Sequence, residues 1–424
     1  MKPEIKKRIE MIRRGEVPPG YTKSRIGLVP TEWENVMFSN IFEEKIEFAD
    51  ETSVIPLYSL TIENGVVPKT ERYERSHLVK KETDTYKIVS KDQLVYNPMN
   101  IRFGALARFK ENKKVAVSSY YNIFSVDMDY DLRFIENYLK SVRMNYLYNS
   151  ISTGSLKEKK RVHFSQFLEL ELPIPSQTER NKIAEILSEW DKAIEKQEKL
   201  IELKKEQKNG LAFKLLTGKA RINGFKSKWP KISMSDCFER INEKNHENNN
   251  NILTISAQRG LISQEHYFSK QIASESLLRY YLLKKGDYAY NKSYSIGYPF
   301  GAIKRLENFE KGIVSPLYIC FRIKNNNFSN DYFKQYFDSG FLNEEIQKIA
   351  QEGARNHGLL NVSVEEFFQI VLRIPEDIKE QKAIAEILMM ADKEIELLEK
   401  ELNMIKEQKK GLMELLLTGI IRVK

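Results

Sequence analysis

The strongest constraint on the fold of this chain is a stretch of 47 residues that occurs at 176–222 and again, 201 residues later, at 377–423. The two copies are identical at 23 of the 47 aligned positions, far more than unrelated segments share. The matched blocks are Ile-Ala-Glu-Ile-Leu at 183–187 and 384–388, Lys-Glu-Gln-Lys at 205–208 and 406–409, and Leu-Thr-Gly at 216–218 and 417–419. The chain therefore contains an internal repeat and is built from two equivalent pieces.

Each copy of the repeat is predicted to form one long helix. Ser176 and Glu179 have the spacing of a capping box, in which side chains satisfy the first free amides of a helix, and the same spacing recurs in the second copy. Gly218 and Gly419 can adopt the left-handed conformation in which helices commonly end. About 40 residues at ~1.5 Å rise each would give a rod of roughly 60 Å.

A narrow apolar seam runs along both predicted helices in steps of three and four residues, which is the heptad pattern of a coiled coil. A lone helix of this kind would leave its seam in water, so we expect the two copies to pack on each other. Docking of each seam on its own neighbouring domain is the alternative. The seam positions are Ile183, Leu187, Trp190, Ile194, Gln197, Ile201, Lys204, Lys208, Leu211 and Leu215 in the first copy, and Ile384, Leu388, Ala391, Ile395, Leu398, Leu402, Ile405, Lys409, Leu412 and Leu416 in the second.

The remaining sequence forms two large bodies that precede the helices. The expected divisions are an N-terminal helix and linker at 1–30, a body at 31–175, a helix at 176–222, a second body at 223–375 and a second helix at 376–424. The bodies are rich in Tyr, Phe, Val and Ile with Asn and Gly between, which favours short strands and turns, with one helix each near 132–146 and 331–349. The residues after the first helix resemble those at the start of the chain. The sequence therefore has the order of a circular arrangement of two equivalent units that is opened at one point.

Composition favours a polyanionic partner in the cytoplasm. Lysine and arginine number 68 against 59 acidic residues, which gives a net charge of +9. No apolar run approaches ~18 residues and the N-terminus lacks an apolar signal core, so neither a membrane span nor secretion is expected. Cys237 and Cys320 have no CxxC partner and no histidine at metal spacing, so we expect free thiols and no metal site.

A search for catalytic chemistry finds no convincing constellation. The stretch Asn97-Pro98-Met99-Asn100 resembles a loop of amino-methyltransferases, but it lacks the aromatic residue that stacks on a flipped base. Nuclease-type residues near 377–382 share one helical turn, where Glu380 already has a capping role. No Gly-x-x-x-x-Gly-Lys phosphate loop occurs, and the five histidines are scattered.

Several repeated features together resemble one known family. They are the proline before each helix, the Glu-Arg or Glu-Gln pair at 179–180 and 380–381, the Ile-Ala-Glu-Ile-Leu blocks, Asp191 and Asp392, and the closing Leu-Thr-Gly. This set resembles the conserved regions of the specificity subunits of type I restriction-modification enzymes, over the whole chain. Arg180 is a departure, because the family usually has the glutamine that is present as Gln381.

The resemblance implies an α+β fold in which two mixed α/β target-recognition domains are joined by two long helices, packed as an antiparallel coiled coil in a pseudo-twofold circular arrangement. Each domain would read one half of an asymmetric bipartite site in double-stranded DNA. The helices would set the gap between the half-sites and dock the partner subunits. The chain itself would catalyse nothing and hold no cofactor: two methylase subunits would bind S-adenosylmethionine, and two motor-nuclease (restriction) subunits would use ATP and Mg.

Antiparallel pairing with Ile183 opposite Leu416 would place Trp190 against Lys409 and Ile201 against Leu398. Polar residues in the loops of the two bodies are the candidates for DNA contact. They are Tyr96, Asn97, Asn100, Arg102, Lys157, Lys159 and Lys160 in the first body, and Tyr290, Asn291, Lys292, Tyr294, Arg355, Asn356 and His357 in the second. A solvated turn or a core tyrosine is the alternative for each of them.

Two other classes of protein stay open at this point. One is an enzyme, a nuclease or methyltransferase fused to this recognition architecture, which would need cofactor or metal motifs. The other is a coiled-coil scaffold that binds proteins and not DNA, which would explain the helices but not two divergent basic bodies.

Overall fold

The computed structural model of the chain describes residues 3–49, 55–69, 86–156, 159–264, 277–293, 297–350 and 360–423. It divides into two compact units, which we call unit 1 (Met1–Gln197 with Glu401–Lys424) and unit 2 (Glu198–Lys400). The division falls inside the two long helices, and not at their ends as the sequence-based boundaries have it. Each unit therefore contains one body together with part of both helices.

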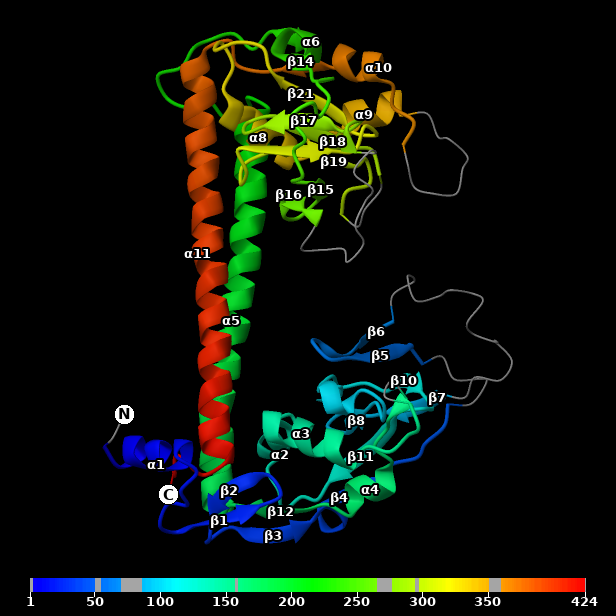
Figure 1. The fold of residues 1–424 in the computed structure, drawn as a ribbon, viewed down its shortest axis with the longest axis vertical. Coiled ribbons are helices and arrows are strands. Elements are labelled where there is room, and N and C mark those ends of the chain that lie inside the picture. The colour runs from blue at the N-terminus through cyan, green and yellow to red at the C-terminus, as the bar shows by residue number, and fades with distance from the viewer. Residues whose placement is uncertain are drawn as a thin grey trace. The chain divides into compact units, whose positions relative to one another are not determined.

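The two repeats form helices α5 (Gln177–Leu216) and α11 (Ile378–Leu417), each of 40 residues and drawn side by side in Figure 1. They run antiparallel, and one ion pair of the repeat fixes their register in both units. Lys409 lies 2.6 Å from Asp191 in unit 1, and Lys208 lies 2.5 Å from Asp392 in unit 2. The predicted antiparallel register is thus confirmed to within one residue.

Every predicted seam position is buried or half-buried. Ile183, Leu187, Ile384 and Leu388 are each at most 2% exposed. The ends of the seam also belong to the cores of the bodies. At these ends the seam residues therefore pack both on the other long helix and on the neighbouring body. Gly218 (φ 71°) and Gly419 (φ 67°) have the left-handed conformation expected just beyond each helix.

The body of unit 1 is built on a four-stranded antiparallel sheet in the order β4-β11-β8-β9, with shorter strand pairs around it. Its pairs are β3 with β12, β5 with β6, β7 with β10, and β1 with β2. The strands are β1 (Tyr21–Ser24), β2 (Gly27–Pro30), β3 (Glu34–Met37), β4 (Phe42–Glu44), β5 (Tyr58–Thr61), β6 (Gly65–Pro68), β7 (Tyr86–Val89), β8 (Leu94–Tyr96), β9 (Leu106–Arg108), β10 (Val115–Ser118), β11 (Asn122–Val126) and β12 (Glu171–Ile174). The helices are α1 (Pro3–Arg13), α2 (Leu132–Leu139), α3 (Val142–Ile151) and α4 (Phe164–Leu168), with 3-10 turns η1 (Phe38–Asn40) and η3 (Ile101–Phe103).

The body of unit 2 has a sheet with the equivalent order, β14-β21-β18-β19. Its pairs β13 with β22, β15 with β16, and β17 with β20 correspond to those of unit 1. The strands are β13 (Lys231–Ser233), β14 (Phe238–Arg240), β15 (Leu253–Ser256), β16 (Gly260–Ser263), β17 (Tyr281–Lys284), β18 (Tyr288–Asn291), β19 (Ala302–Arg305), β20 (Lys311–Val314), β21 (Ile319–Ile323) and β22 (Val371–Arg373). The helices are α6 (Met234–Cys237), α8 (Asn330–Asp338), α9 (Asn343–Ile349) and α10 (Val364–Gln369).

The structure differs from the sequence-based prediction of secondary structure in two places. The helix expected near 132–146 is two helices, because Ser141 caps a new one with its hydroxyl, and the helix expected near 331–349 is interrupted at Gly340 (φ 73°). The segment expected to be a linker contains the hairpin β1–β2, which has no counterpart among the described residues of unit 2. Arg143 of α3 holds this hairpin by donating to the carbonyls of Ile26 and Leu28, at 2.8 and 3.2 Å.

A buried ion pair closes each unit by joining the start of one long helix to the end of the other. Glu179 is 2% exposed and accepts from the Nε and NH2 atoms of Arg422 at 2.7 and 2.9 Å. Glu380 is fully buried and accepts from Arg221 at the same two distances. The expected capping role of these glutamates is therefore wrong: Ser176 accepts the amide of Glu179, while the carboxylate binds an arginine far away in sequence.

The departure from the family pattern at Arg180 preserves its main contact. Gln381 donates to the carbonyl of Pro375 at 2.8 Å, and Arg180 donates to the equivalent carbonyl of Pro175 at 3.1 Å. Arg180 also stacks on the ring of Tyr130, at 4.6 Å from its centroid. A longer side chain thus fulfils the same positioning role in unit 1.

Candidate nucleic-acid interface

The two bodies share a turn at the end of a central strand, where Asn97 directly follows β8 and Asn291 is the last residue of β18. In each turn the side-chain oxygen of the asparagine accepts the backbone amide two residues later, Met99 in one and Ser293 in the other, both at 3.0 Å. This contact is an Asx turn, which fixes the backbone where the strand ends. Both bodies have a Tyr-Asn pair here, at 96–97 and 290–291, and the asparagine of each pair serves to build the backbone turn.

The tyrosines next to these turns are not available to DNA. Tyr96 and Tyr290 are fully buried, and their hydroxyls donate to the carbonyls of Val162 at 3.3 Å and Phe300 at 2.8 Å. Burial raises the pKa of both phenols above the ordinary value. The prediction that Tyr96 and Tyr290 contact DNA is therefore wrong, because an amphipathic side chain with a buried hydroxyl partner belongs to the core.

The turn in unit 1 continues into a surface that carries hydrogen-bonding side chains. Asn100 is exposed, and Arg102 lies over the ring of Phe103 with its guanidinium 4.5 Å from the centroid. Arg102 also donates to the Met99 carbonyl at 3.3 Å, which restrains its direction. Asparagine and arginine are the side chains that pair with adenine and guanine edges in the major groove, and here Asn100 is exposed and Arg102 half-buried.

The other predicted contact residues fall into three groups: residues on the surface, one residue that supports a loop, and residues outside the described part of the chain. Lys159 is exposed and Lys160 half-exposed in the loop before α4. The ammonium of Lys292 points to the Val362 carbonyl at 3.3 Å and supports the loop before α10. Five predicted residues lie outside the described part of the chain: Lys157, Tyr294, Arg355, Asn356 and His357.

Sequence reasoning missed an exposed aromatic and apolar cluster beside Arg102. Phe103 is 57%, Tyr146 75% and Ile62 52% exposed. A side chain at Gly104 would meet Ile62 and the neighbour of Tyr146, Asn145, which places the β5–β6 turn, η3 and α3 at one surface. Gly104 has a φ of 96°, a left-handed conformation that favours glycine, so this glycine was the one signal in the sequence that the chain turns here.

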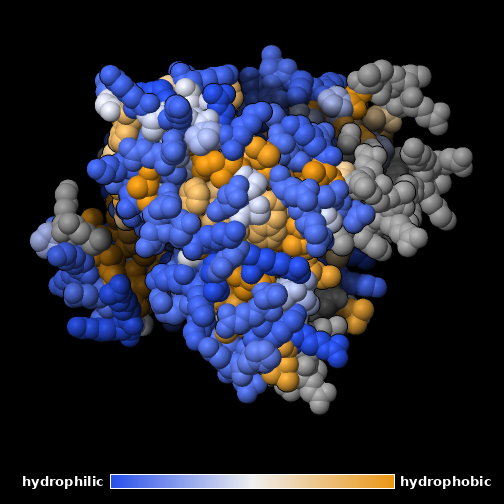
Figure 2. Space-filling view, turned by 90° about the horizontal axis from the view of Figure 1, so that it is seen from above, coloured by the Kyte–Doolittle hydropathy of each residue, from blue (hydrophilic) through white to orange (hydrophobic). Residues whose placement is uncertain are grey.

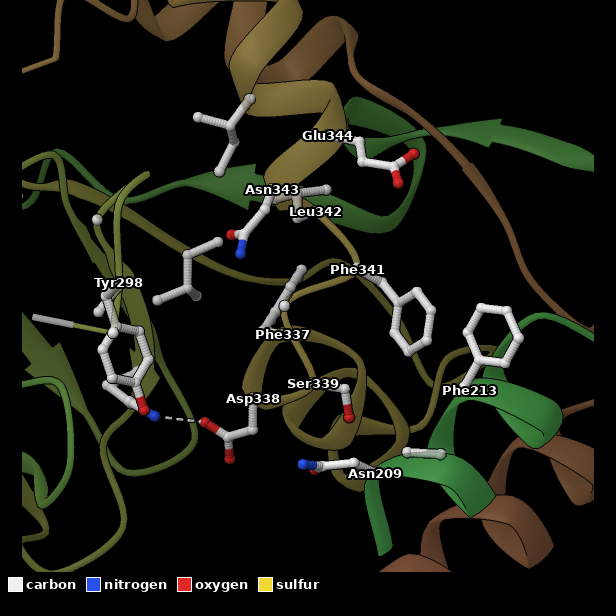
Figure 3. A pocket seen from close by; sticks show the side chains of 18 of the residues that line it. Asn209, Phe213, Tyr298, Phe337, Asp338, Ser339, Phe341, Leu342, Asn343 and Glu344 are labelled. Atoms are coloured by element: carbon white, nitrogen blue, oxygen red, sulfur yellow. Dashed lines mark hydrogen bonds and ion pairs between the residues drawn. The ribbon is translucent and has the colours of Figure 1, made fainter. Parts of the chain in front are cut away.

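In unit 2 the equivalent region is open and forms a cavity of about 810 Å³, shown in Figure 3. Phe213 of α5 and Phe341 stack at 6.2 Å on one side, and Tyr298 lies on the other. Lys304 and Asp338 form an ion pair of 2.6 Å at its wall. In unit 1 the buried Ile101 of η3 packs into the core of the body.

Asp338, at the wall of this cavity, forms ion pairs with Lys304 and Lys334. Burial raises the pKa of Asp338, but the ammonium groups of Lys304 and Lys334 outweigh it and hold that pKa below its usual value. Within the described ranges, no group of three or more His, Cys, Asp or Glu side chains could hold a metal ion. Cys237 and Cys320 are free and buried, and burial raises the pKa of the Cys237 thiol to about 12.

The described surface is mainly hydrophilic in the view of Figure 2, with smaller apolar patches between the polar side chains. None of the helices that the structure describes is long and apolar enough to cross a membrane. The candidate interface therefore combines polar loops on a mixed α/β body with a paired helical frame, repeated once. This architecture defines a class of protein that presents two different recognition surfaces on equivalent supports.

Comparison with known proteins identifies that class. Residues 30–205 match the family described as the type I restriction modification DNA specificity domain. The chain is 26% identical to the type I restriction enzyme MjaVIII specificity subunit of Methanocaldococcus jannaschii over 318 residues, which cover 70% of each protein. It is 23% identical to the MjaX specificity subunit of the same organism, itself provisionally assigned, over 99% of this chain and 93% of that one.

One solved structure shares the fold over most of both chains. A chain from a study of complex assembly and conformational transition in the type I restriction-modification system has a TM-score of 0.50, at 10% identity, and covers 93% of this chain and 99% of that one. The S subunit from M. genitalium has a TM-score of 0.49 and 16% identity over 91% of this chain and 96% of that one. Residues 30–205 thus match the DNA specificity domain of type I restriction-modification systems, and most of the chain is similar to specificity subunits of that family, as its repeated blocks indicate.

Proposed function

We propose that this chain reads an asymmetric, bipartite site in double-stranded DNA, with one half-site for each body. The observation that carries the proposal is that the two bodies have the same strand order but different surfaces. Residues that match between the bodies, such as Tyr96 and Tyr290, are buried and hold the fold. The residues that differ are those left to read bases, so the two halves of the target should differ.

In unit 1 we assign base reading to the surface around Gly104. Asn100 and Arg102 supply hydrogen-bonding groups, and the exposed ring of Phe103 supports the guanidinium. Lys159 and Lys160 would contact phosphates, which position the protein without reading the sequence. Loss of one bidentate arginine contact would cost about 1–3 kcal/mol and relax specificity at one base pair.

In unit 2 the equivalent surface is formed by other residues. The β15–β16 turn, which corresponds to the β5–β6 turn of unit 1, exposes Gln258 and Arg259. Glutamine and arginine favour adenine and guanine respectively, as asparagine and arginine do in unit 1. Arg259 was not among the residues selected from the sequence, because no matching basic residue stands in the first body.

The partners in this proposal follow from the family. The chain is the non-catalytic, cytoplasmic recognition subunit, and α5 and α11 set the gap between half-sites and dock two methylase subunits. Those subunits would bind S-adenosylmethionine, and two restriction subunits would use ATP and Mg. The paired frame supports this role because the same ion pair and the same closing arginine recur in both units, so a partner meets similar groups twice.

The test is the methylation pattern on a random DNA pool, measured with the methylase subunit present. Arg102→Ala should relax one position of one half-site, and Arg259→Ala should relax one position of the other. Arg13→Ala, an exposed arginine on α1, is the matched control and should leave both half-sites unchanged. Changes in both half-sites from a single substitution would contradict the assignment of one body to one half-site.

Binding should also weaken steeply with salt, because lysines and arginines that contact phosphates release condensed counterions. The slope of log affinity against log salt should correspond to several phosphate contacts. An affinity that does not depend on salt would favour the alternative of a scaffold that binds only proteins.

A further inference from the structure

The paired helices of unit 2 expose large apolar side chains that neither the seam nor the body uses. Leu200 is 39% and Leu203 51% exposed on α5, and Leu397 is 54% and Met390 68% exposed on α11. We call these four residues the outer apolar face. Half-exposed leucine and methionine clustered on a helix pair mark a surface that another chain covers more often than scattered single residues do.

The outer apolar face lies away from the body of unit 2. The ion pair of Lys204 with Glu394, at 2.6 Å, bridges the helices on this side. Leu200 stands four residues before Lys204 and Leu397 three residues after Glu394, so both lie on the same side as that ion pair.

The body attaches on the other side of the same helix pair. Ala385 and Leu388 belong to its core, and Asp392 accepts from Gln335 of α8 at 2.8 Å. Asp392 and Glu394 are two positions apart, which is more than half a helical turn. Nothing in the described part of the body therefore covers the outer face.

The repeat shows that this face is special to unit 2. One repeat length of 201 residues away, Met390 corresponds to Glu189, Leu397 to Lys196 and Leu200 to Glu401. Only the position of Leu203 stays apolar, as Met404. Unit 1 thus presents charged side chains where unit 2 presents apolar ones, although the seams of both are alike.

The spacing of the outer apolar face identifies the kind of group that fits it. Met390 and Leu397 are seven residues apart on α11, and Leu200 and Leu203 are three apart on α5, which are the spacings that receive a further helix. Exposed ion pairs of Glu396 with Lys393 at 3.2 Å and Lys400 at 2.5 Å form a mixed-charge rim beside Leu397. Such a rim suits an amphipathic helix with both signs of charge on its flanks.

We propose that the outer apolar face of unit 2 is the tighter of two docking sites for the methylase subunit, occupied by an amphipathic helix of that subunit. This inference rests on the proposed function, in which methylase subunits dock on α5 and α11. The shared parts of the repeat bind both copies, and the apolar side chains add affinity at unit 2 alone. Two identical methylase subunits therefore bind in order, unit 2 first.

The experiment is a titration of the full chain with its methylase subunit, followed by native mass spectrometry and repeated by sedimentation velocity. The wild-type chain should accumulate a complex with one methylase before the complex with two. Leu397→Glu with Leu200→Glu should weaken the first binding step by at least about tenfold and make the two steps nearly equal. These positions are exposed, so thermal melting should show an unchanged fold.

A gain-of-function variant provides the matched test in unit 1. Glu189→Met with Lys196→Leu transfers the apolar pair of α11 to the equivalent positions of α5, and should strengthen the second binding step toward the first. Two equal binding steps in the wild-type chain would overturn the inference while leaving the proposed function intact. A complete lack of methylase binding would instead overturn the proposed docking, and a self-dimer of the chain that Leu397→Glu dissociates would identify a second copy as the occupant.

Discussion

Removal of Arg422 tests whether the buried ion pair that closes unit 1 holds that unit together. Glu179 is 2% exposed, and Arg422 supplies two of its hydrogen bonds, at 2.7 and 2.9 Å. In an Arg422→Ala chain the carboxylate would keep only the weaker contacts from the Trp33 indole at 3.2 Å and the Val423 amide at 3.4 Å, and it would stay buried. A buried charge left without its partner costs about 3–5 kcal/mol.

That cost should appear in unit 1 alone. For a unit of about 200 residues, 1 kcal/mol shifts the melting temperature by ~2–4 °C, so the expected loss is roughly 6–20 °C. Amide hydrogen exchange followed by mass spectrometry resolves the two units, and protection should fall in peptides from unit 1. Arg221→Ala is the matched control, because it removes the equivalent partner of Glu380 and should lower protection in unit 2.

The double variant Glu179→Gln with Arg422→Ala distinguishes a lost attraction from a stranded charge. Without the charge, the desolvation penalty falls, so the double variant should be more stable than Arg422→Ala by about 2 kcal/mol. If Arg422→Ala alone changed the free energy of unfolding by less than ~1 kcal/mol, the reasoning that this ion pair closes unit 1 would be refuted.

Two further predictions concern unit 2. Ile201→Asp with Leu398→Asp places two charges in the seam, where Ile201 is 6% exposed, and should lower the free energy of urea unfolding by at least about 4 kcal/mol. The control Leu203→Asp, on the exposed side of the same helix, should lower it by under ~0.5 kcal/mol. Equal effects would show that the seam does not pair. The lowered pKa of Asp338 means that its ion pairs stabilise unit 2 above the unfolded value near ~3.9 and that this stabilisation is lost as the pH falls through the lower folded value. Asp338→Asn should therefore be less stable at pH 7 by roughly 2 kcal/mol and should lose less of its stability in acid than the wild-type chain does; parallel acid unfolding curves would contradict the role of this carboxylate.

The helical frame was predictable from the sequence because its stabilising contacts recur at short, regular spacings. The seam from Ile183 to Leu416 follows from heptad steps, and repetition fixed its extent. The closing contact was not predictable, because Glu179 has capping-box spacing whether its carboxylate binds its own helix or an arginine 243 residues away. Local spacing carries no information on a partner at that distance.

The bodies were predictable in outline and not in detail. Alternating aromatic and β-branched residues indicated strands, but each strand here is short, so pairing depends on contacts between distant segments. Tyr96 and Tyr290 were selected as DNA contacts among the polar loop residues, and the structure shows that both are buried in the core. The exposed residues around Gly104 come from three separate elements, which sequence order does not bring together.

Each closing ion pair joins a glutamate near the start of one long helix to an arginine just beyond the end of the other, and this arrangement has a consequence for synthesis of the protein. When Glu380 is made, its partner Arg221 is already 159 residues behind it in the chain, so unit 2 can close as soon as its own sequence is complete. Glu179 must wait for Arg422, 243 residues later, which at 5–20 residues per second is about 12–50 s. During that interval the Glu179 carboxylate has no arginine partner, and the seam of α5 in unit 1 has no second helix to pack against. Unit 1 is therefore the part of the protein that is exposed to chaperones and proteases on the ribosome, although it is translated first.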